Sequence, residues 1–418
     1  MKKLVVMGQG YVGLPMALRA AAVGMDVVGL DSDAALVERL NAGRSHITDV
    51  SVDELRQGLD FGYSASADPT CIADADVVLV CVPTPLHRDG GPDLTAILDA
   101  AGVIGRHVRK GTLVVLESTT YPGTTEEVFA PLVLGDQWAQ GEVMIAFSPE
   151  RIDPGNQVYG VRNTPKVVGG LTSRCTEAAV EFYGILVDTV VAAKGAKEAE
   201  MAKLLENTFR HVNIALVNEM VRFSNELGID LWDAIDCAAT KPFGYMAFRP
   251  GPGVGGHCIP VDPAYLSHRV KAELGYAFRM VELAEEINRA APLYTATRAL
   301  ELLNDRRMAA NGARILLLGV TYKPDVADCR ETPAMPLARK LIDWGAVVSY
   351  HDPYVPGWRV SPGRSLNRAA DPYEAAEQAD LTILLQPHGS YDLARLAASS
   401  RLLLDTRGVV TASGVVRL

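Results

Sequence analysis

A glycine-rich turn near the N-terminus constrains the fold more than any other part of the sequence. An apolar run, typical of a buried strand, ends at Gly8, and Gly8, Gly10 and Gly13 have the spacing G-x-G-x-x-G. A helix of small residues follows, and the next strand-like run, "DVVGL", ends at Asp31. This order of strand, glycine turn, helix, strand and acid is typical of a Rossmann dinucleotide-binding unit.

The same turn predicts a ligand. Glycines let the backbone meet a pyrophosphate, and the free N–H groups at the start of the helix, around Tyr11 and Val12, bind it. We expect Asp31 to accept hydrogen bonds from ribose hydroxyls and to repel a 2′-phosphate, which favours NAD over NADP. The alternative is a tight turn in a domain that binds no ligand.

The rest of the N-terminal region alternates between strand-like and helical segments. The strand-like runs are "ADVVLVCVPTP", "GTLVVLEST" and "VMIAFSPE", and this alternation predicts a parallel, doubly wound sheet. Pro83 and Thr84 follow one of these strands, where loops at the edge of the sheet face a cofactor. A rigid turn explains "VPTP" equally well.

The pattern changes at about Lys197. Apolar residues recur at helical spacing with no Gly or Pro until Gly228, and a second helical run covers 262–305. Strand-helix alternation resumes near Arg314. We therefore predict an α/β protein with two Rossmann-like parallel-sheet domains joined by a central helical dimerisation domain. The expected boundaries are 1–196, 197–308 and 309–418.

Composition weighs against several classes of partner. The chain has 418 residues, enough for two or three domains, and a formal net charge of -10, which disfavours nucleic acid and anionic membranes. No apolar run is long enough to span a bilayer. Six cysteines without a C-x-x-C pair predict a reduced, cytoplasmic chain with no disulfide framework and no metal site.

One cysteine lies in an unusual segment, "PGPGVGGHCIP", which covers 250–260. We expect the glycines to let a substrate approach Cys258, and a nearby cation or helix N-terminus would lower the pKa of its thiol. The other five cysteines are expected to be inert. His257 has a core or hydrogen-bonding role as its simplest explanation, and Asp262, before Pro263, could cap a helix.

Lys203 and Asn207 are four residues apart and share a helix face, although ordinary surface residues have the same spacing. An NAD site together with a cysteine nucleophile suggests a definite chemistry. The thiol adds to an aldehyde, hydride loss gives a thioester, and water releases an acid.

The motifs together resemble the UDP-glucose/GDP-mannose dehydrogenase family, the four-electron nucleotide-sugar 6-dehydrogenases. The resemblance runs nearly end to end. It rests on "GQGYVGLP", "VPTP", "ESTTYPGTT", "SPERIDPG", "AEMAKLLENTFRHVNIALVNE", "GPGVGGHCIPVDP" and "LGVTYKPDVADCRETP". It implies an N-terminal NAD domain, a homodimer formed through the central helices and a C-terminal domain for a UDP-sugar substrate.

The resemblance also assigns roles to residues. Cys258 matches the nucleophile. Lys203, Asn207 and Asp262 match the group that handles the hydroxyl proton and the oxyanion, and Thr119 and Glu150 match the residues that hold the hydrolytic water. Thr119 and Arg330, next to Asp328 in "DCRET", are further expected cofactor contacts. The expected substrate contacts are Glu150, Arg151, Lys203, Asn207, Arg210, Gly255, Lys323 and Arg407, the last of which would reach the partner subunit's substrate.

Two departures from the family pattern bear on the sugar. UDP-glucose enzymes usually have Ser where this chain has His257, and a second glutamate where it has Pro154. "ENTFRHVNIALVNE" and "KPFGYMAFRPGPGVGGHCIP" instead resemble the branch that oxidises UDP-N-acetylhexosamines, especially UDP-N-acetylglucosamine. Arg210 and His211 lie one turn beyond Asn207, where a sugar contact and a dimer contact are equally reasonable.

Three alternatives remain open from the sequence. The enzyme could use UDP-glucose, UDP-N-acetylmannosamine or GDP-mannose. It could be a two-electron Rossmann dehydrogenase that needs no cysteine. It could also be a non-catalytic protein that binds nucleotide sugars.

Overall fold

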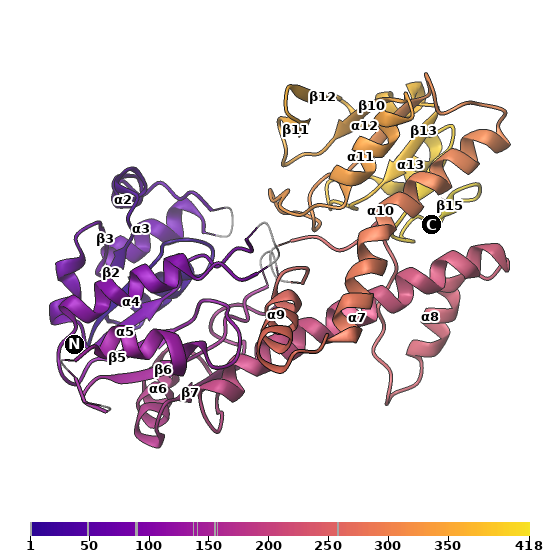
Figure 1. Cartoon of the computed structure of the whole chain (residues 1–418). Coiled ribbons are helices and arrows are strands. Elements are labelled where there is room, and N and C mark those ends of the chain that lie inside the picture. The colour runs from indigo at the N-terminus through magenta and orange to yellow at the C-terminus, as the bar shows by residue number, and fades with distance from the viewer. Residues whose placement is uncertain are drawn as a thin grey trace. The chain divides into compact units, whose positions relative to one another are not determined.

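The structure is a computed structural model that describes residues 2–47, 50–87, 91–136, 138–139, 141–153, 156, 158–256 and 259–418 (Figure 1). The chain forms two compact units. The first comprises Met1–Glu206 with Ala264–Tyr276, and the second comprises Asn207–Pro263 with Ala277–Leu418. The chain divides into two compact units, whereas the sequence predicts three domains. The boundaries of those three domains therefore stay a prediction.

The first unit contains an eight-stranded sheet. Its strand order is β3-β2-β1-β4-β5-β6-β7-β8, and all neighbours run parallel except β6 and β7. The strands are β1 (Lys3–Met7), β2 (Asp26–Leu30), β3 (Tyr63–Ser66), β4 (Val77–Val80), β5 (Leu113–Leu116), β6 (Met144–Phe147), β7 (Lys166–Gly170) and β8 (Val190–Ala192).

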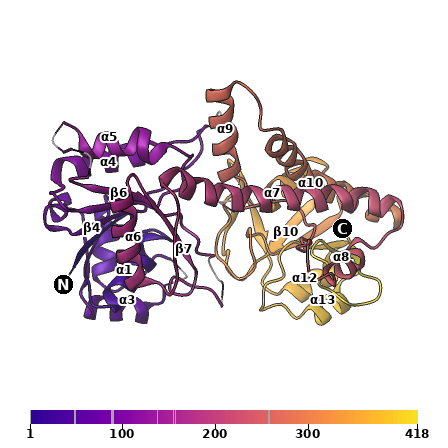
Figure 2. The same cartoon turned by 90° about the horizontal axis from the view of Figure 1, so that it is seen from below.

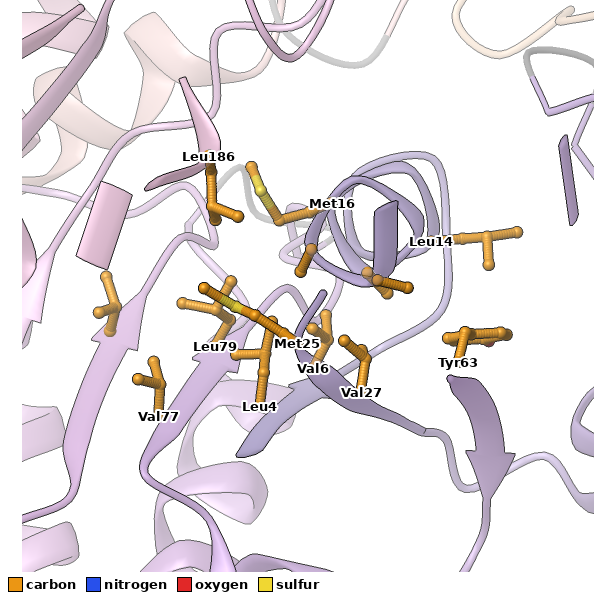
Figure 3. Close-up of a cluster of buried hydrophobic side chains, with 14 of the residues drawn as sticks. Leu4, Val6, Leu14, Met16, Met25, Val27, Tyr63, Val77, Leu79 and Leu186 are labelled. Carbon is orange, nitrogen blue, oxygen red and sulfur yellow. The ribbon is translucent and has the colours of Figure 1, made fainter. Parts of the chain in front are cut away.

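Helices cover both faces of this sheet (Figure 2). Successive side chains of a strand point to opposite faces, so Leu4 and Val6 of β1 pack on one face while Val5 packs on the other. Figure 3 shows the first face, where strand residues meet Met16 and Leu186. That face carries α1 (Gly13–Ala22), α2 (Ala34–Asn41), α3 (Val52–Asp60) and α6 (Ser173–Leu186); the other carries η1 (Pro69–Asp74), α4 (Thr95–His107), η2 (Thr125–Phe129) and α5 (Ala130–Leu134).

The strand order reverses direction between β1 and β4. In open α/β sheets, ligands bind beyond the carboxyl ends of the strands at such a switch point, because the loops there separate toward opposite faces. The loops after β1, β2, β4, β5 and β6 carry most of the residues expected at the cofactor and water sites.

The second unit joins helices to a second sheet with the order β11-β12-β10-β9-β13-β14-β15, and only β11 and β12 pair antiparallel. Helices α10 and α11 pack on one face of this sheet, and α12 and α13 pack on the other. The strands are β9 (Arg314–Leu318), β10 (Val347–His351), β11 (Trp358–Ser361), β12 (Arg364–Arg368), β13 (Leu381–Leu384), β14 (Leu403–Asp405) and β15 (Val416–Arg417). The helices are α8 (Leu231–Ala239), α10 (Arg279–Asp305), α11 (Ala334–Asp343), α12 (Pro372–Gln378) and α13 (Leu393–Ser399).

Two helices contain residues of both units: α7 (Ala196–Glu226) and α9 (Asp262–Leu274). The predicted fold class, two parallel α/β sheets with a helical centre, is confirmed. Among the described residues, no helix combines the length and apolar character that a bilayer crossing needs.

Candidate active site

The three glycines of the first turn have different reasons to be glycine. Gly8 has φ +87°, and a Cβ there would lie 2.6 Å from the carbonyl oxygen of Cys81. A Cβ at Gly13 would lie 1.9 Å from the carbonyl oxygen of Gly8. Gly10 faces open space. Packing therefore requires Gly8 and Gly13, whereas Gly10 leaves room for a phosphate to reach the backbone.

The first turn of α1 is also suited to an anion. Val12 precedes the helix, and no side chain in the described part of the chain caps it. The N–H of Leu14 donates to the carbonyl oxygen of Gly10 at 3.2 Å, and an uncapped helix N-terminus attracts an anion. Tyr11, 38% exposed, lies in the same loop. These features fit the pyrophosphate of a dinucleotide.

Asp31 is held beside this turn by the backbone. Its Oδ2 accepts a hydrogen bond from the N–H of Gln9 at 2.9 Å, and its Oδ1 accepts one from Asp33 at 3.0 Å. Gln9 is fully buried, and its Oε1 accepts from Tyr63 Oη at 2.9 Å. Burial, and then the charge of Asp31, raise the pKa of Tyr63 well above its ordinary value, so the phenol stays a donor. Sequence reasoning missed Gln9 because it occupies an unspecified position of the motif.

The turn Val82–Pro85 is anchored from a distant helix. Tyr265, on α9, donates from Oη to the carbonyl oxygen of Thr84 at 2.5 Å, and both residues are buried. Ser118 Oγ donates to the carbonyl oxygen of Val82 at 2.8 Å. No pattern in the sequence pointed to Tyr265, which lies 181 residues from Thr84.

Glu150 follows β6 and has one engaged and one open oxygen. Its Oε1 accepts a hydrogen bond from the N–H of Ile152, while no group in the described part of the chain donates to the buried Oε2. The Nζ of Lys166 lies 3.9 Å from that oxygen. A buried carboxylate oxygen without a donor is a site for a water molecule. Thr119, the other residue expected to hold water, is partly buried in the loop after β5.

Arg151 is engaged within the first unit. Its Nη2 lies 2.5 Å from Glu206 Oε1, and its Nη1 donates to the carbonyl oxygen of Pro165 at 2.8 Å. The substrate contact expected of Arg151 stays a prediction.

Helix α7 brings a buried acid to the loop that carries Thr119. Glu200 Oε2 accepts from the N–H of Gly123 at 2.6 Å, and its Oε1 accepts from the N–H of Thr125 at 2.8 Å. Burial raises the pKa of Glu200 to about 7 despite these donors. Lys203, one turn further, is 6% exposed, and no carboxylate in the described ranges pairs with its ammonium. An ammonium in this state can stabilise a developing oxyanion.

In the second unit, Asn207 and Asp262 meet although 55 residues separate them. Asn207 Nδ2 donates to Asp262 Oδ2 at 2.6 Å, and their exposed fractions are 7% and 2%. The surface explanation for Lys203 and Asn207 is therefore wrong, because both side chains are buried. Asp262 is the first residue of α9.

The segment before Cys258 is packed against the loop after β9. A Cβ at Gly255 would lie 2.8 Å from the carbonyl oxygen of Glu331, and one at Gly256, which has φ +86°, would lie 2.8 Å from the Tyr322 ring. The N–H of Gly256 donates to the carbonyl oxygen of Arg330 at 3.2 Å. Packing inside the protein thus requires these two glycines. Cys258 and His257 lie outside the described residues, so the expected access to the thiol stays a prediction.

Three cationic residues expected at the substrate or cofactor lie in loops at the carboxyl ends of strands of the second sheet. Lys323 is half-buried after β9. Arg330 Nη2 lies 2.6 Å from Asp328 Oδ2. Arg407, after β14, donates from Nε to the carbonyl oxygen of Leu385 at 2.7 Å, and burial lowers its pKa to about 10.

Arg210 and His211 occupy different environments. Arg210 is exposed, whereas His211 is 1% exposed and its backbone carbonyl accepts from Asn288 Nδ2 at 3.2 Å. Burial lowers the pKa of His211 although Glu285 opposes the effect. His211 is therefore a packed residue between α7 and α10. Within the described ranges, no three metal-ligating side chains gather.

Comparison with known proteins decides the family. Residues 2–187 match the NAD binding domain of the UDP-glucose/GDP-mannose dehydrogenase family, 197–290 its central domain, and 316–412 its UDP binding domain. The chain belongs to the UDP-glucose/GDP-mannose dehydrogenase family. It is an NAD-dependent nucleotide-sugar dehydrogenase, and the expectations of family, enzyme class and cofactor are confirmed.

Curated relatives differ in the sugar that they are named for. A UDP-N-acetyl-D-mannosamine dehydrogenase of Methanocaldococcus jannaschii is 33% identical over 98% of this chain and 93% of its own length. A UDP-N-acetyl-D-glucosamine 6-dehydrogenase of Pseudomonas aeruginosa is 35% identical over 84% of this chain and 83% of its own. Among solved structures, UDP-D-ManNAc dehydrogenase from Pyrococcus horikoshii superposes with a TM-score of 0.88 at 29% identity, over 99% of this chain and 98% of its own.

Proposed function

We propose that this enzyme oxidises carbon 6 of a UDP-N-acetylhexosamine to the uronic acid, with UDP-N-acetylglucosamine as its preferred substrate. The relatives named above act on N-acetylhexosamines, and the segments on both sides of the catalytic residues resemble the N-acetylglucosamine branch. The observation that carries the chemistry is the buried hydrogen bond between Asn207 and Asp262, four residues after Cys258. The hydrogen bond offsets part of the cost of burying the Asp262 carboxylate, and it holds both side chains in one arrangement.

Each residue of the proposed site has a role in one chemical step. NAD, when bound, supplies the hydride acceptor for both oxidations. Lys203, with Asn207 and Asp262, handles the proton of the 6-hydroxyl and stabilises negative charge on the sugar oxygen. The Cys258 thiolate adds to the aldehyde, and loss of a second hydride leaves a thioester on the sulfur.

Hydrolysis of the thioester requires a water molecule and a base. The open Oε2 of Glu150 accepts a proton from the water, and the Thr119 hydroxyl orients it. The water's oxygen bonds to the acyl carbon, the carbon–sulfur bond breaks, and the free acid leaves.

The decisive measurement is the number of NADH molecules formed per sugar consumed. Purified enzyme would be mixed with excess NAD and, in parallel, UDP-N-acetylglucosamine, UDP-N-acetylmannosamine, UDP-glucose and GDP-mannose. We expect two NADH per sugar and an acidic product, fastest with UDP-N-acetylglucosamine. One NADH per sugar would contradict the thioester, and a faster rate with another sugar would reassign the substrate.

Two variants separate the steps. Cys258→Ser should stop turnover after the first oxidation, and unchanged turnover would eliminate the covalent step. Lys203→Ala should slow the oxidations themselves, because the charge on the sugar oxygen loses its partner.

We also propose a homodimer formed through the central helices. On α7, Phe209, Leu216 and Phe223 recur every seven residues and are 46%, 52% and 45% exposed. Such a stripe is typical of a helix face that packs against a partner. Sedimentation should show a dimer that Phe223→Glu weakens, and a wild-type monomer would contradict the assignment.

A further inference from the structure

A cluster of buried ionisable side chains surrounds Glu150. Glu117 follows β5, Glu150 follows β6 and Lys166 begins β7, so three neighbouring strands contribute one charged residue each. The side chains of Glu117, Lys166 and Glu150 are 0%, 6% and 10% exposed. In the part of the chain that the structure describes, the other titratable groups that interact with the cluster are Tyr183 of α6 and Cys81 after β4.

The hydrogen bonds are distributed unequally between the two carboxylates. Glu117 has both oxygens engaged, since Lys166 Nζ donates to Oε2 at 3.0 Å and Tyr183 Oη donates to Oε1. The same ammonium is 3.9 Å from Glu150 Oε2, which is beyond hydrogen-bond distance. One buried cation therefore lies between a satisfied carboxylate and one with an open oxygen.

Each group has a defined charge. Burial alone would lower the pKa of Lys166, but Glu117 and Glu150 outweigh it and raise that pKa, so the ammonium persists. Burial raises the pKa of Tyr183 and of Cys81 well above their ordinary values, so both stay neutral. Burial raises the pKa of Glu117, and the charge of Lys166 opposes this effect. Both oxygens of Glu117 accept hydrogen bonds, which fits its ionised form, so the charged neighbours of Glu150 among the described residues are Lys166 and Glu117.

We propose that the buried Lys166–Glu117 pair, whose charges lie beside the open oxygen of Glu150, controls the pH dependence of thioester hydrolysis. The inference rests on the proposed role of Glu150. The positive charge of Lys166 attracts negative charge at the open oxygen of Glu150, and the negative charge of Glu117 repels it. Both are positioning residues, since they act through Glu150.

The two charges make opposite predictions. Lys166→Met removes the cation that lies between the two buried carboxylates, so negative charge beside the hydrolytic water is disfavoured. In the plot of hydrolysis rate against pH, the acidic limb should move to higher pH by about one to two units. Glu117→Gln leaves Lys166 paired with Glu150 alone, and the limb should move to lower pH. The double variant removes both charges and should return toward wild type.

The experiment uses single turnovers quenched with acid across pH 5–9, with saturating NAD and the UDP-sugar that the wild-type enzyme prefers. NADH reports the oxidations, and the free uronic acid reports hydrolysis. We expect the pH profile of uronic acid release to shift and the pH profile of NADH formation to stay unchanged. Tyr183→Phe is the matched control, because it removes a buried hydrogen bond and no charge.

Each outcome decides one question. Opposite shifts in the two single variants support the inference, whereas shifts of equal sign, or none, overturn it. If Lys166→Met does not fold, Glu117→Gln and the double variant still differ in the expected direction, and Lys166→Arg should keep the wild-type profile. A wild-type enzyme that forms one NADH, or no acid, contradicts the proposed function instead.

Discussion

Glu200 should make the stability of the first unit depend on pH. It is 1% exposed, and its carboxylate accepts hydrogen bonds from Gly123 and from the backbone and hydroxyl of Thr125. Burial raises its pKa from 4.5 to about 7. The folded protein therefore holds this proton more tightly than the unfolded chain does. We consider Glu200→Gln, which keeps the shape and removes the titration.

The magnitude follows from proton linkage. At about 1.36 kcal/mol per pH unit, a pKa raised from 4.5 to about 7 corresponds to ~3 kcal/mol. This contribution to stability is fully present below pH 4.5 and is lost as the pH rises through 7. Relative to Glu200→Gln, the wild-type free energy of unfolding should fall by ~3 kcal/mol between pH 4.5 and 8.

The assay must follow the first unit alone, because a chain with two units has no single unfolding transition. Urea-dependent hydrogen exchange, read on peptides from β5 and α4, gives the free energy of unfolding at each pH. Glu198→Gln is the control, since Glu198 is exposed on the same helix. The free energies of unfolding of wild type and Glu200→Gln are compared at each pH. If their difference stays constant within about 1 kcal/mol from pH 4.5 to 8, the reasoning is refuted.

Three further predictions concern the two nucleotide-binding regions. Gly256→Ala places a Cβ at φ +86° against the Tyr322 ring and should cost ~1–3 kcal/mol, which lowers the Tm of the second unit by roughly 2–12 °C in calorimetry. Gly357→Ala, in open space, should leave that Tm unchanged. Tyr265→Phe removes the anchor of the turn after β4 and should raise the KM for NAD by up to about fivefold with kcat nearly unchanged; an unchanged KM would separate that turn from the cofactor. Asp31→Asn should lower kcat/KM for NAD by about 10- to 100-fold and reduce the enzyme's preference for NAD over NADP, as measured with both cofactors at matched pH.

The glycine motifs show how far sequence reasoning reached. Spacing predicted the turn and its ligand, and the structure separates Gly10, which faces open space, from Gly8 and Gly13, which packing requires. In the segment before Cys258 the expectation was substrate access. The structure shows that Gly255 and Gly256 pack against the loop after β9, about seventy residues away in the sequence, and substrate access to Cys258 stays a prediction.

The residues that support the site were not predictable from local pattern. Tyr265, Glu200 and Lys166 act on partners 181, 77 and 49 residues away. Tyr265 and Lys166 belong to none of the quoted motifs, and Glu200 lies in "AEMAKLLENTFRHVNIALVNE" without an expected role. A buried glutamate or lysine in a strand or helix has the same appearance in the sequence as an exposed one. Only its desolvation and its partners distinguish the two.

The sequence by itself determined the α/β architecture, the NAD turn and the family, because strand and helix periodicity and backbone requirements are local properties of the chain. Only the tertiary structure decided that Asn207 meets Asp262, that one oxygen of Glu150 is left open and that Lys166 lies between two carboxylates. Charge interactions depend on distance and burial, and folding sets both by joining segments that are far apart in the sequence.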